Sequence, residues 1–188
     1  MARVHERPYV VRAWAYLLHP FLVLGAALGI AMRIREGASA AALVGLLGFT
    51  LWAFNEAGQQ TLTLFGFDEW RAAYATADEL TRERIRSGAL MYDGLWDGMY
   101  FLLLIGFSVG NLCFGQALVR KRGLTRLTGA FLLAAVLLTS TFMLSELGWA
   151  LPSEAIGTWA YAAVQPLGRA LVGVWLWRFS DERESLDD

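Results

Sequence analysis

Five apolar runs of about twenty residues or more constrain this chain more than any other feature of its sequence. An α-helix rises about 1.5 Å per residue, so roughly twenty residues cross the hydrocarbon core of a bilayer, which is about 30 Å thick. Hydrophobic residues make up 56% of the 188 residues, against about 45–50% in soluble domains. The sequence therefore predicts an all-α integral membrane protein, a bundle of five transmembrane helices. The predicted spans are Arg12–Met32, Ala40–Phe65, Trp96–Val119, Leu127–Leu151 and Ala155–Trp177.

The connections between the predicted spans are short, with one exception. Short connections predict antiparallel neighbours in a compact bundle, so residues 1–179 are predicted to form one transmembrane domain, followed by a disordered tail at 180–188. The long connection, Asp68–Asp93, is charged, and Asp78, Glu79 and Arg82 have the spacing of ion pairs along a helix. This segment predicts an amphipathic interfacial or extramembrane helix between the second and third spans, rather than a sixth span.

An odd number of spans places the two termini on opposite sides of the membrane. We call the side of the N-terminus side A and the side of the C-terminus side B. The first apolar run ends at Arg33 rather than at a small-residue cleavage site, so we expect a retained span and not a signal peptide. The short Arg120–Gly123 loop on side B contains three basic residues, while the Pro152 turn on side A contains none. This contrast favours side B as the cytoplasmic side.

Composition excludes several classes of function. The net charge is −1, so no basic surface indicates nucleic acid as a partner. The single cysteine, Cys113, excludes an intrachain disulfide framework and a Cys-rich zinc site. Lys121, the only lysine, lies in a predicted loop, which excludes a retinal-type Schiff base within the membrane. The usual hydrolase and nucleotide-binding motifs are also absent, so an enzyme is the least favoured class, and no cofactor or metal is indicated.

Polar and ionisable side chains interrupt the apolar runs. Such residues are costly in lipid, and they nearly always face the interior of a bundle or a water-filled cavity. Counted from side A, the ionisable ones lie in the half of the bundle closer to that side, and two polar residues precede Pro20 and Pro166, where proline removes a helical hydrogen bond. We therefore predict a polar pocket that opens towards side A. Its candidate ligand-binding residues are His19, Asn55, Glu56, Gln59, Asp97, Glu146, Gln165 and Arg169.

The same residues also allow simpler interpretations. Glu56 and Arg169 have opposite charges and overlapping depths, so they can form a structural ion pair that only fixes helix packing. The polar positions can instead form an interface with another membrane subunit. His19 is the only histidine in a predicted span, and a satisfied core imidazole is a more common role for it than metal ligation. Glycines spaced four apart, such as Gly106 and Gly110, predict close helix packing, either within the bundle or in a dimer.

Two segments carry a resemblance to a known family. The stretch Leu51-Trp-Ala-Phe-Asn-Glu-Ala-Gly-Gln-Gln-Thr-Leu-Thr-Leu-Phe and the stretch Trp96-Asp-Gly-Met-Tyr-Phe, with the apolar runs that follow, resemble small bacterial membrane proteins of the DUF4386 type. The resemblance covers roughly residues 13–177 and rests on helix order and scattered residues. It implies a multi-pass protein of the bacterial inner membrane, and it carries no activity or site residue to transfer.

On these grounds the sequence favours a membrane protein that binds a small molecule or ion, as a sensor or a transport-related subunit. Arg169 would hold an anionic group or pair with Glu56, and Glu56 and Glu146 would be the protonatable groups. Five helices are few for an alternating-access carrier, which usually pairs inverted repeats, so a monomeric transporter is disfavoured and a homo-oligomer stays open. The alternative is an accessory or assembly subunit that packs against larger membrane partners and has no ligand or catalysis of its own.

Overall fold

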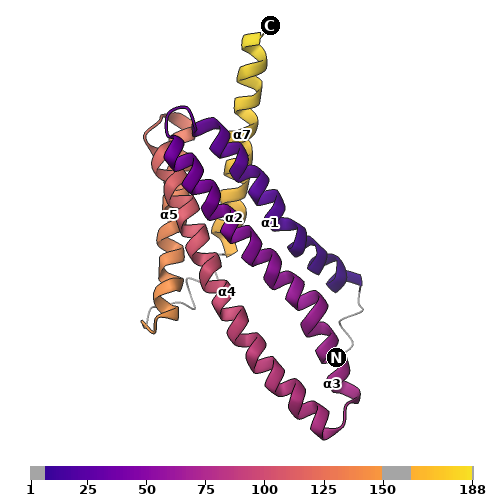
Figure 1. The fold of residues 1–188 in the computed structure, drawn as a ribbon. Coiled ribbons are helices and arrows are strands. Elements are labelled where there is room, and N and C mark those ends of the chain that lie inside the picture. The colour runs from indigo at the N-terminus through magenta and orange to yellow at the C-terminus, as the bar shows by residue number, and fades with distance from the viewer. Residues whose placement is uncertain (1–6, 150–161, 188) are drawn as a thin grey trace.

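The chain folds into helices joined mostly by short turns (Figure 1). The structure, a computed structural model, describes residues 7–149 and 162–187, and no strand occurs in these ranges. A π-helical turn, η2 (Thr63–Phe67), joins the second helix to the third without a break. The prediction of an all-α fold is therefore confirmed. The helices are α1 (Arg7–Ile34), α2 (Ser39–Leu62), α3 (Asp68–Thr76), α4 (Glu79–Val119), α5 (Gly123–Glu146) and α7 (Ala162–Asp187).

Four helical segments of the described chain are long and apolar enough to cross a membrane. They contain the first three predicted spans completely and indicate a multi-pass membrane protein. The fourth predicted span, Leu127–Leu151, is too long at its end, because α5 stops at Glu146 and a turn with Gly148 at positive φ follows. The predicted fifth span begins at Ala155, and residues 155–161 lie outside the described part of the chain. The rest of that predicted span forms the apolar first part of α7. The four candidate spans are Pro8–Ile34, Ser39–Thr76, Glu79–Val119 and Gly123–Ser145.

The segment predicted as a separate surface helix, residues 68–93, is organised differently in the structure. After α3 and a short turn, α4 runs without a break from Glu79 to Val119. Asp78 caps α4, because its Oδ1 accepts a hydrogen bond from the Thr81 N–H at 2.8 Å. No proline lies within α4, so every residue of the helix keeps the backbone N–H that continues its hydrogen bonds. Its 41 residues extend about 60 Å, roughly twice the thickness of a hydrocarbon core.

The last helix also extends further than the sequence predicted. A disordered tail was expected from Ser180, whereas α7 continues as a helix to Asp187. No glycine or proline follows Gly173, so no residue of low helix propensity ends α7 earlier. Figure 1 shows the end of α7 projecting from the bundle beyond the α1–α2 turn, at the opposite end of the molecule from α3. We call these two ends of the molecule side B and side A, following the sequence prediction.

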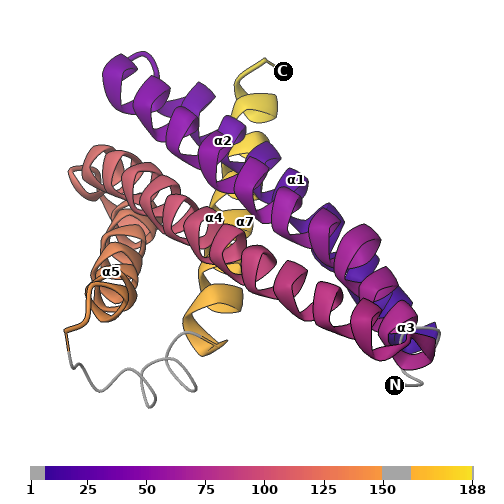
Figure 2. The same cartoon turned by 60° about the horizontal axis from the view of Figure 1, so that its bottom comes forward.

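Glycines bring α2 and α4 into backbone contact. A Cβ atom on Gly48 would lie 2.6 Å from the amide nitrogen of Gly110, and one on Gly106 would lie 2.7 Å from the carbonyl oxygen of Gly48. Only a hydrogen atom fits at these positions, which is how small residues allow close helix approach in membranes. Gly106 and Gly110 therefore serve packing within the chain. Figure 2 shows α2 and α4 running along each other, with α5 and α7 crossing them at an angle.

An aromatic cluster fills the space between α2 and α4. The ring of Phe49 stacks on Phe114 with centroids 5.5 Å apart, and it meets Phe107 edge-on at 6.0 Å.

The outer faces of the helices are also apolar, and side chains such as Leu22 and Leu137 are exposed there. An extended apolar exterior of this kind suits a lipid environment.

Candidate functional site

A cavity of about 310 Å³ lies among α1, α2, α4, α5 and α7. Apolar side chains such as Leu132 and Leu138 provide most of its lining. Three of the eight candidate residues, His19, Gln165 and Arg169, also line it. The fold therefore brings polar residues from the first and last described helices to one mainly apolar cavity.

His19 lines the cavity from α1 with one ring nitrogen unsatisfied. Its ring meets Trp52 edge-on, with centroids 5.7 Å apart and an interplanar angle of 90°. Nε2 is buried, and it has no hydrogen-bond partner in the described part of the chain. A buried polar atom without a partner costs about 1–3 kcal/mol, so such atoms are uncommon. Among the described residues, Nε2 thus has no partner of the kind that a satisfied core imidazole would have.

Two prolines lie inside the helices that carry these polar residues. Pro20 follows His19 in α1, and Pro166 follows Gln165 in α7. Each proline lacks an N–H, so the carbonyl oxygen four residues earlier loses its helical partner. Irregular backbone at membrane depth is tolerated where it is buried in protein or borders a cavity. Both prolines directly follow residues of the cavity lining.

Arg169 carries a positive charge beside the same cavity. One of its guanidinium N–H groups donates a hydrogen bond to Oε1 of Gln165, one turn earlier in α7. The guanidinium is also close enough to His19 and Glu56 for a Coulombic interaction with each of them. The Glu56–Arg169 ion pair stays a prediction, since the described hydrogen bonds of these two side chains go to Gln60 and Gln165.

The position of Arg169 along α7 can be given relative to the contacts that anchor this helix near side B. Arg33, in the last turn of α1, donates a hydrogen bond from Nη2 to the carbonyl oxygen of Leu176 at 2.9 Å. Trp175 Nε1 donates to Oγ1 of Thr125, in the first turn of α5, also at 2.9 Å. Arg169 comes seven residues before Leu176, which is about 10 Å further from side B along a helix. Arg169, an exposed residue of α7, therefore lies about two helical turns from this anchor.

Two candidate residues of α2, Asn55 and Gln59, form hydrogen bonds with backbone carbonyl oxygens. Gln59 is buried, and its Nε2 donates a hydrogen bond to the carbonyl oxygen of Trp96 at 3.0 Å, which ties α2 to α4. Asn55 donates from Nδ2 to the carbonyl oxygen of Leu51 in its own helix at 2.8 Å. Neither residue lines the cavity. Gln59 serves the packing of α2 against α4, and Asn55 bonds only to the backbone of its own helix.

The candidate carboxylates are found in different surroundings. Oε1 of Glu56 accepts a hydrogen bond from Gln60 Nε2 at 3.4 Å, and Glu56 does not line the cavity. Asp97 is exposed on α4. Glu146 is the last residue of α5, and its side chain lies outside the described part of the structure. Among the described residues, the polar positions expected in one pocket are thus divided between the cavity and a second group of contacts along α2.

Two further polar residues line the cavity and were not among the candidates. Asn111 is buried on α4, and its Nδ2 donates to the carbonyl oxygen of Phe107 at 2.8 Å. Thr139 is buried on α5, and its Oγ1 donates to the carbonyl oxygen of Ala135 at 2.8 Å. Asn111 stands out in its apolar run, so the sequence contained a signal for it. Thr139 did not, because a threonine that bonds to its own helix is common in membrane spans.

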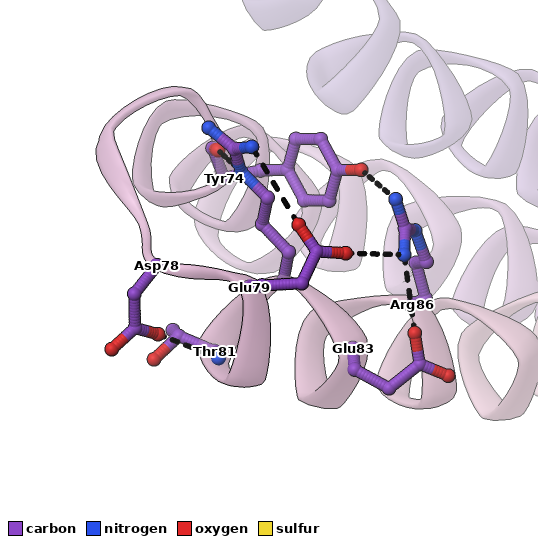
Figure 3. Close-up of polar contacts among 7 residues, drawn as sticks. Tyr74, Asp78, Glu79, Thr81, Glu83 and Arg86 are labelled. Carbon is purple, nitrogen blue, oxygen red and sulfur yellow. Dashed lines mark hydrogen bonds and ion pairs between the residues drawn. The ribbon is translucent and has the colours of Figure 1, made fainter.

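Beyond the bundle, an ionic cluster joins α3 to the first turns of α4 (Figure 3). Arg86 donates from Nη2 to Tyr74 Oη at 2.8 Å, and from Nη1 to Glu79 Oε1 at 3.3 Å and Glu83 Oε2 at 3.1 Å. Arg82 adds an ion pair with Glu79 at 3.9 Å, which confirms the pair predicted from their spacing. Exposed ion pairs contribute little stability individually, so the main consequence of this network is to orient α3 against α4.

No family model, curated protein or solved structure matches the chain. Within residues 7–149 and 162–187, no group of three or more His, Cys, Asp or Glu side chains is placed to hold a metal ion. A functional proposal therefore depends on the cavity and on the polar groups beside it.

Proposed function

We propose that this chain is a membrane protein that binds a small molecule, as a sensor or a transport-related subunit, with its site in the cavity between α1 and α7. One observation carries the proposal. The positively charged Arg169 lines a mainly apolar cavity that is also lined by His19, whose buried Nε2 has no hydrogen-bond partner among the described residues.

The polar groups of Arg169 and His19 cost free energy in apolar surroundings unless they have partners. An arginine near the centre of a membrane helix costs about 2.5–3.5 kcal/mol on insertion scales, and such residues commonly mark ligand or ion pathways. A bound molecule with a hydrogen-bonding group would offset the costs of Arg169 and His19 together. The cavity volume of about 310 Å³ lies at the lower end of the range for ligand pockets, about 300–1,000 Å³.

The proposal includes α7 as the fifth span. Its apolar part, 162–177, is anchored near side B by Arg33 and Trp175, and the sequence before it, 155–161, is also largely apolar. Together these residues have the length of a membrane span. We further propose that the membrane is the bacterial inner membrane with side B in the cytoplasm, on the resemblance described above and on the basic Arg120–Gly123 loop.

Native mass spectrometry of the full-length protein, released from its own membrane in mild detergent, tests the proposal. Gly173 lines the cavity and a Cβ atom there would meet nothing within 4 Å, so Gly173→Phe should place a ring at the lining without a clash at Cβ. Gly25 of α1 is equally open but lies outside the lining, and Gly25→Phe is the matched control. We expect a retained small molecule in the wild type and in Gly25→Phe that is lost in Gly173→Phe. A protein that retains no small molecule, or retains it equally in all three forms, contradicts the proposal.

A separate observation favours a second candidate function, that of an accessory subunit in a larger membrane complex. The first part of α4 exposes large apolar side chains, among them Leu90 (74% exposed) and Met91 (79%). Met91 comes 28 residues before Val119, about 42 Å along the helix and therefore beyond a 30 Å core that starts near Val119. Apolar surface outside the core commonly marks a protein interface. A protein partner at fixed stoichiometry, without a small molecule, in the same mass spectra would support this function instead.

A further inference from the structure

From the chemistry of the cavity we infer its ligand class: a single-chain amphiphile with an apolar tail and an anionic oxygen head, which reaches the site from the bilayer. This inference rests on the proposed function and adds the identity of the ligand class to it. Its support comes from the lining, from the two polar groups and from the size and opening of the cavity.

The lining requires a ligand that is apolar over most of its surface. Phe131, Leu132, Leu138 and similar side chains surround most of the volume. The amide of Asn111 and the hydroxyl of Thr139 already donate to carbonyl oxygens of their own helices. A hydrated ion or a sugar would lose most of its hydrogen bonds with water and gain few in return. A hydrocarbon tail has no such hydrogen bonds to lose.

The polar groups beside the cavity favour a ligand that carries a negatively charged acceptor oxygen. Arg169 provides a guanidinium, which pairs well with carboxylate and phosphate oxygens. Nε2 of His19 is buried and without a partner in the described chain, and as an N–H it would donate to the same head group. Among the described residues of the lining, none is Asp or Glu. Arg169 is thus the one charged side chain among these lining residues, and an anionic head group complements its charge.

The size and position of the cavity favour one chain and a route through the lipid. A volume of about 310 Å³ is small among ligand pockets, which span about 300–1,000 Å³, so it suits a single acyl chain better than a two-chain lipid. Leu22 belongs to the lining and is also 75% exposed on α1. The cavity is therefore continuous with an apolar outer face, from which a membrane-dissolved amphiphile would enter without crossing water.

Photolabelling tests the inference with a defined probe. The full-length protein in phosphatidylcholine nanodiscs is titrated with a 16-carbon fatty acid that carries a diazirine at the end of its chain, and the labelled peptides are mapped after illumination. We expect labelling at the cavity lining, abolished in Gly173→Phe and retained in Gly25→Phe. Arg169→Gln should raise the half-saturating concentration roughly tenfold or more, because a charge-assisted pair is lost. Arg126→Gln, at an exposed position of α5, should leave that concentration unchanged.

Competition with unlabelled amphiphiles identifies the head group. Palmitate, lysophosphatidylglycerol and a neutral monoacylglycerol with the same chain length are compared. Competition by palmitate alone assigns a carboxylate head, and competition by the lysophospholipid alone assigns a phosphate head. Equal competition by the neutral monoacylglycerol overturns the anionic head group.

The remaining outcomes separate this inference from the proposed function. Labelling that stays on outer lipid-facing residues and is the same in Gly173→Phe and Gly25→Phe overturns the amphiphile. If native mass spectrometry then still finds a small molecule that Gly173→Phe displaces, the proposed site stands with a different ligand. If it finds none, both proposals fail. Because Gly173→Phe introduces no clash at Cβ, this variant carries the test even if Arg169→Gln does not fold.

Discussion

The guanidinium of Arg33, in the last turn of α1, lies 5.6 Å from the ring centroid of Trp175 in α7. The same guanidinium donates a hydrogen bond to the carbonyl oxygen of Leu176 at 2.9 Å, while the Trp175 ring, only 2% exposed, donates to Thr125 of α5. These contacts hold α7 against both α1 and α5 near side B. The position of Arg169 at the cavity depends on this anchor, because it lies two turns away on the same helix.

Replacing Arg33 by Met should loosen α7. The substitution keeps an apolar stem but removes a charged hydrogen-bond donor and a cation–π contact, so we expect a loss of about 2 kcal/mol in the free energy of unfolding. The measurement is the unfolding temperature in detergent, followed by tryptophan fluorescence. Arg35→Met, in the exposed α1–α2 turn, is the control. An equal decrease in both variants would show that Arg33 does not anchor α7.

Replacing Gly48 by Ala should separate α2 from α4. The added Cβ would lie 2.6 Å from the amide nitrogen of Gly110 and 2.8 Å from the carbonyl oxygen of Gly106. Backbone atoms cannot rotate away, so the helices must move apart, at a cost of about 1–3 kcal/mol. Gly25→Ala, which meets nothing within 4 Å, should keep the stability of the wild type. Thermal unfolding of the two variants side by side decides this, and a stable Gly48→Ala would contradict the observed contact.

The start of α4 should loosen in acid. The hydrogen bond from Thr81 lowers the pKa of the Asp78 carboxyl below its ordinary value of 3.8. A carboxyl whose pKa is lower in the folded state stabilises the fold above its unfolded pKa, and this contribution is lost as the pH falls from 3.8 through the folded pKa. Asp78→Asn retains a good helix cap without the charge, so its cap should not depend on pH. Hydrogen exchange of the Thr81 amide, compared between the wild type and Asp78→Asn at each pH, measures the effect. Parallel exchange profiles for the two proteins would refute it.

Gln59 should matter for stability and not for ligand binding. Gln59→Leu removes the 3.0 Å hydrogen bond to the Trp96 carbonyl oxygen between α2 and α4, which should cost about 1 kcal/mol of unfolding free energy. The cavity lies elsewhere, so small-molecule retention should stay as in the wild type. Unfolding temperature and native mass spectra, recorded on the same preparation, separate the two effects. Loss of the retained molecule in a folded Gln59→Leu protein would show that Gln59 contributes to ligand binding.

The candidate site shows which features of a binding site can be predicted by counting residues along a helix. Position along each helix could be counted from the sequence, and His19, Gln165 and Arg169 do line one cavity. The side of a helix on which each residue lies relative to its neighbours could not be estimated in the same way. Gln59 and Arg169 are both polar interruptions of apolar runs, yet one packs between α2 and α4 and the other borders the cavity.

The sequence by itself determined that this protein is helical and multi-pass, because apolar runs of about twenty residues bury their backbone hydrogen bonds in lipid only as helices. It also indicated the Glu79–Arg82 pair, whose geometry is local to one helix turn. Only the tertiary structure decided the length of α4, the use of Gly48 and Gly106, and the presence of His19 and Arg169 at one cavity. Those features depend on how helices far apart in the sequence rotate and slide against one another, and that choice is made by packing across the whole bundle.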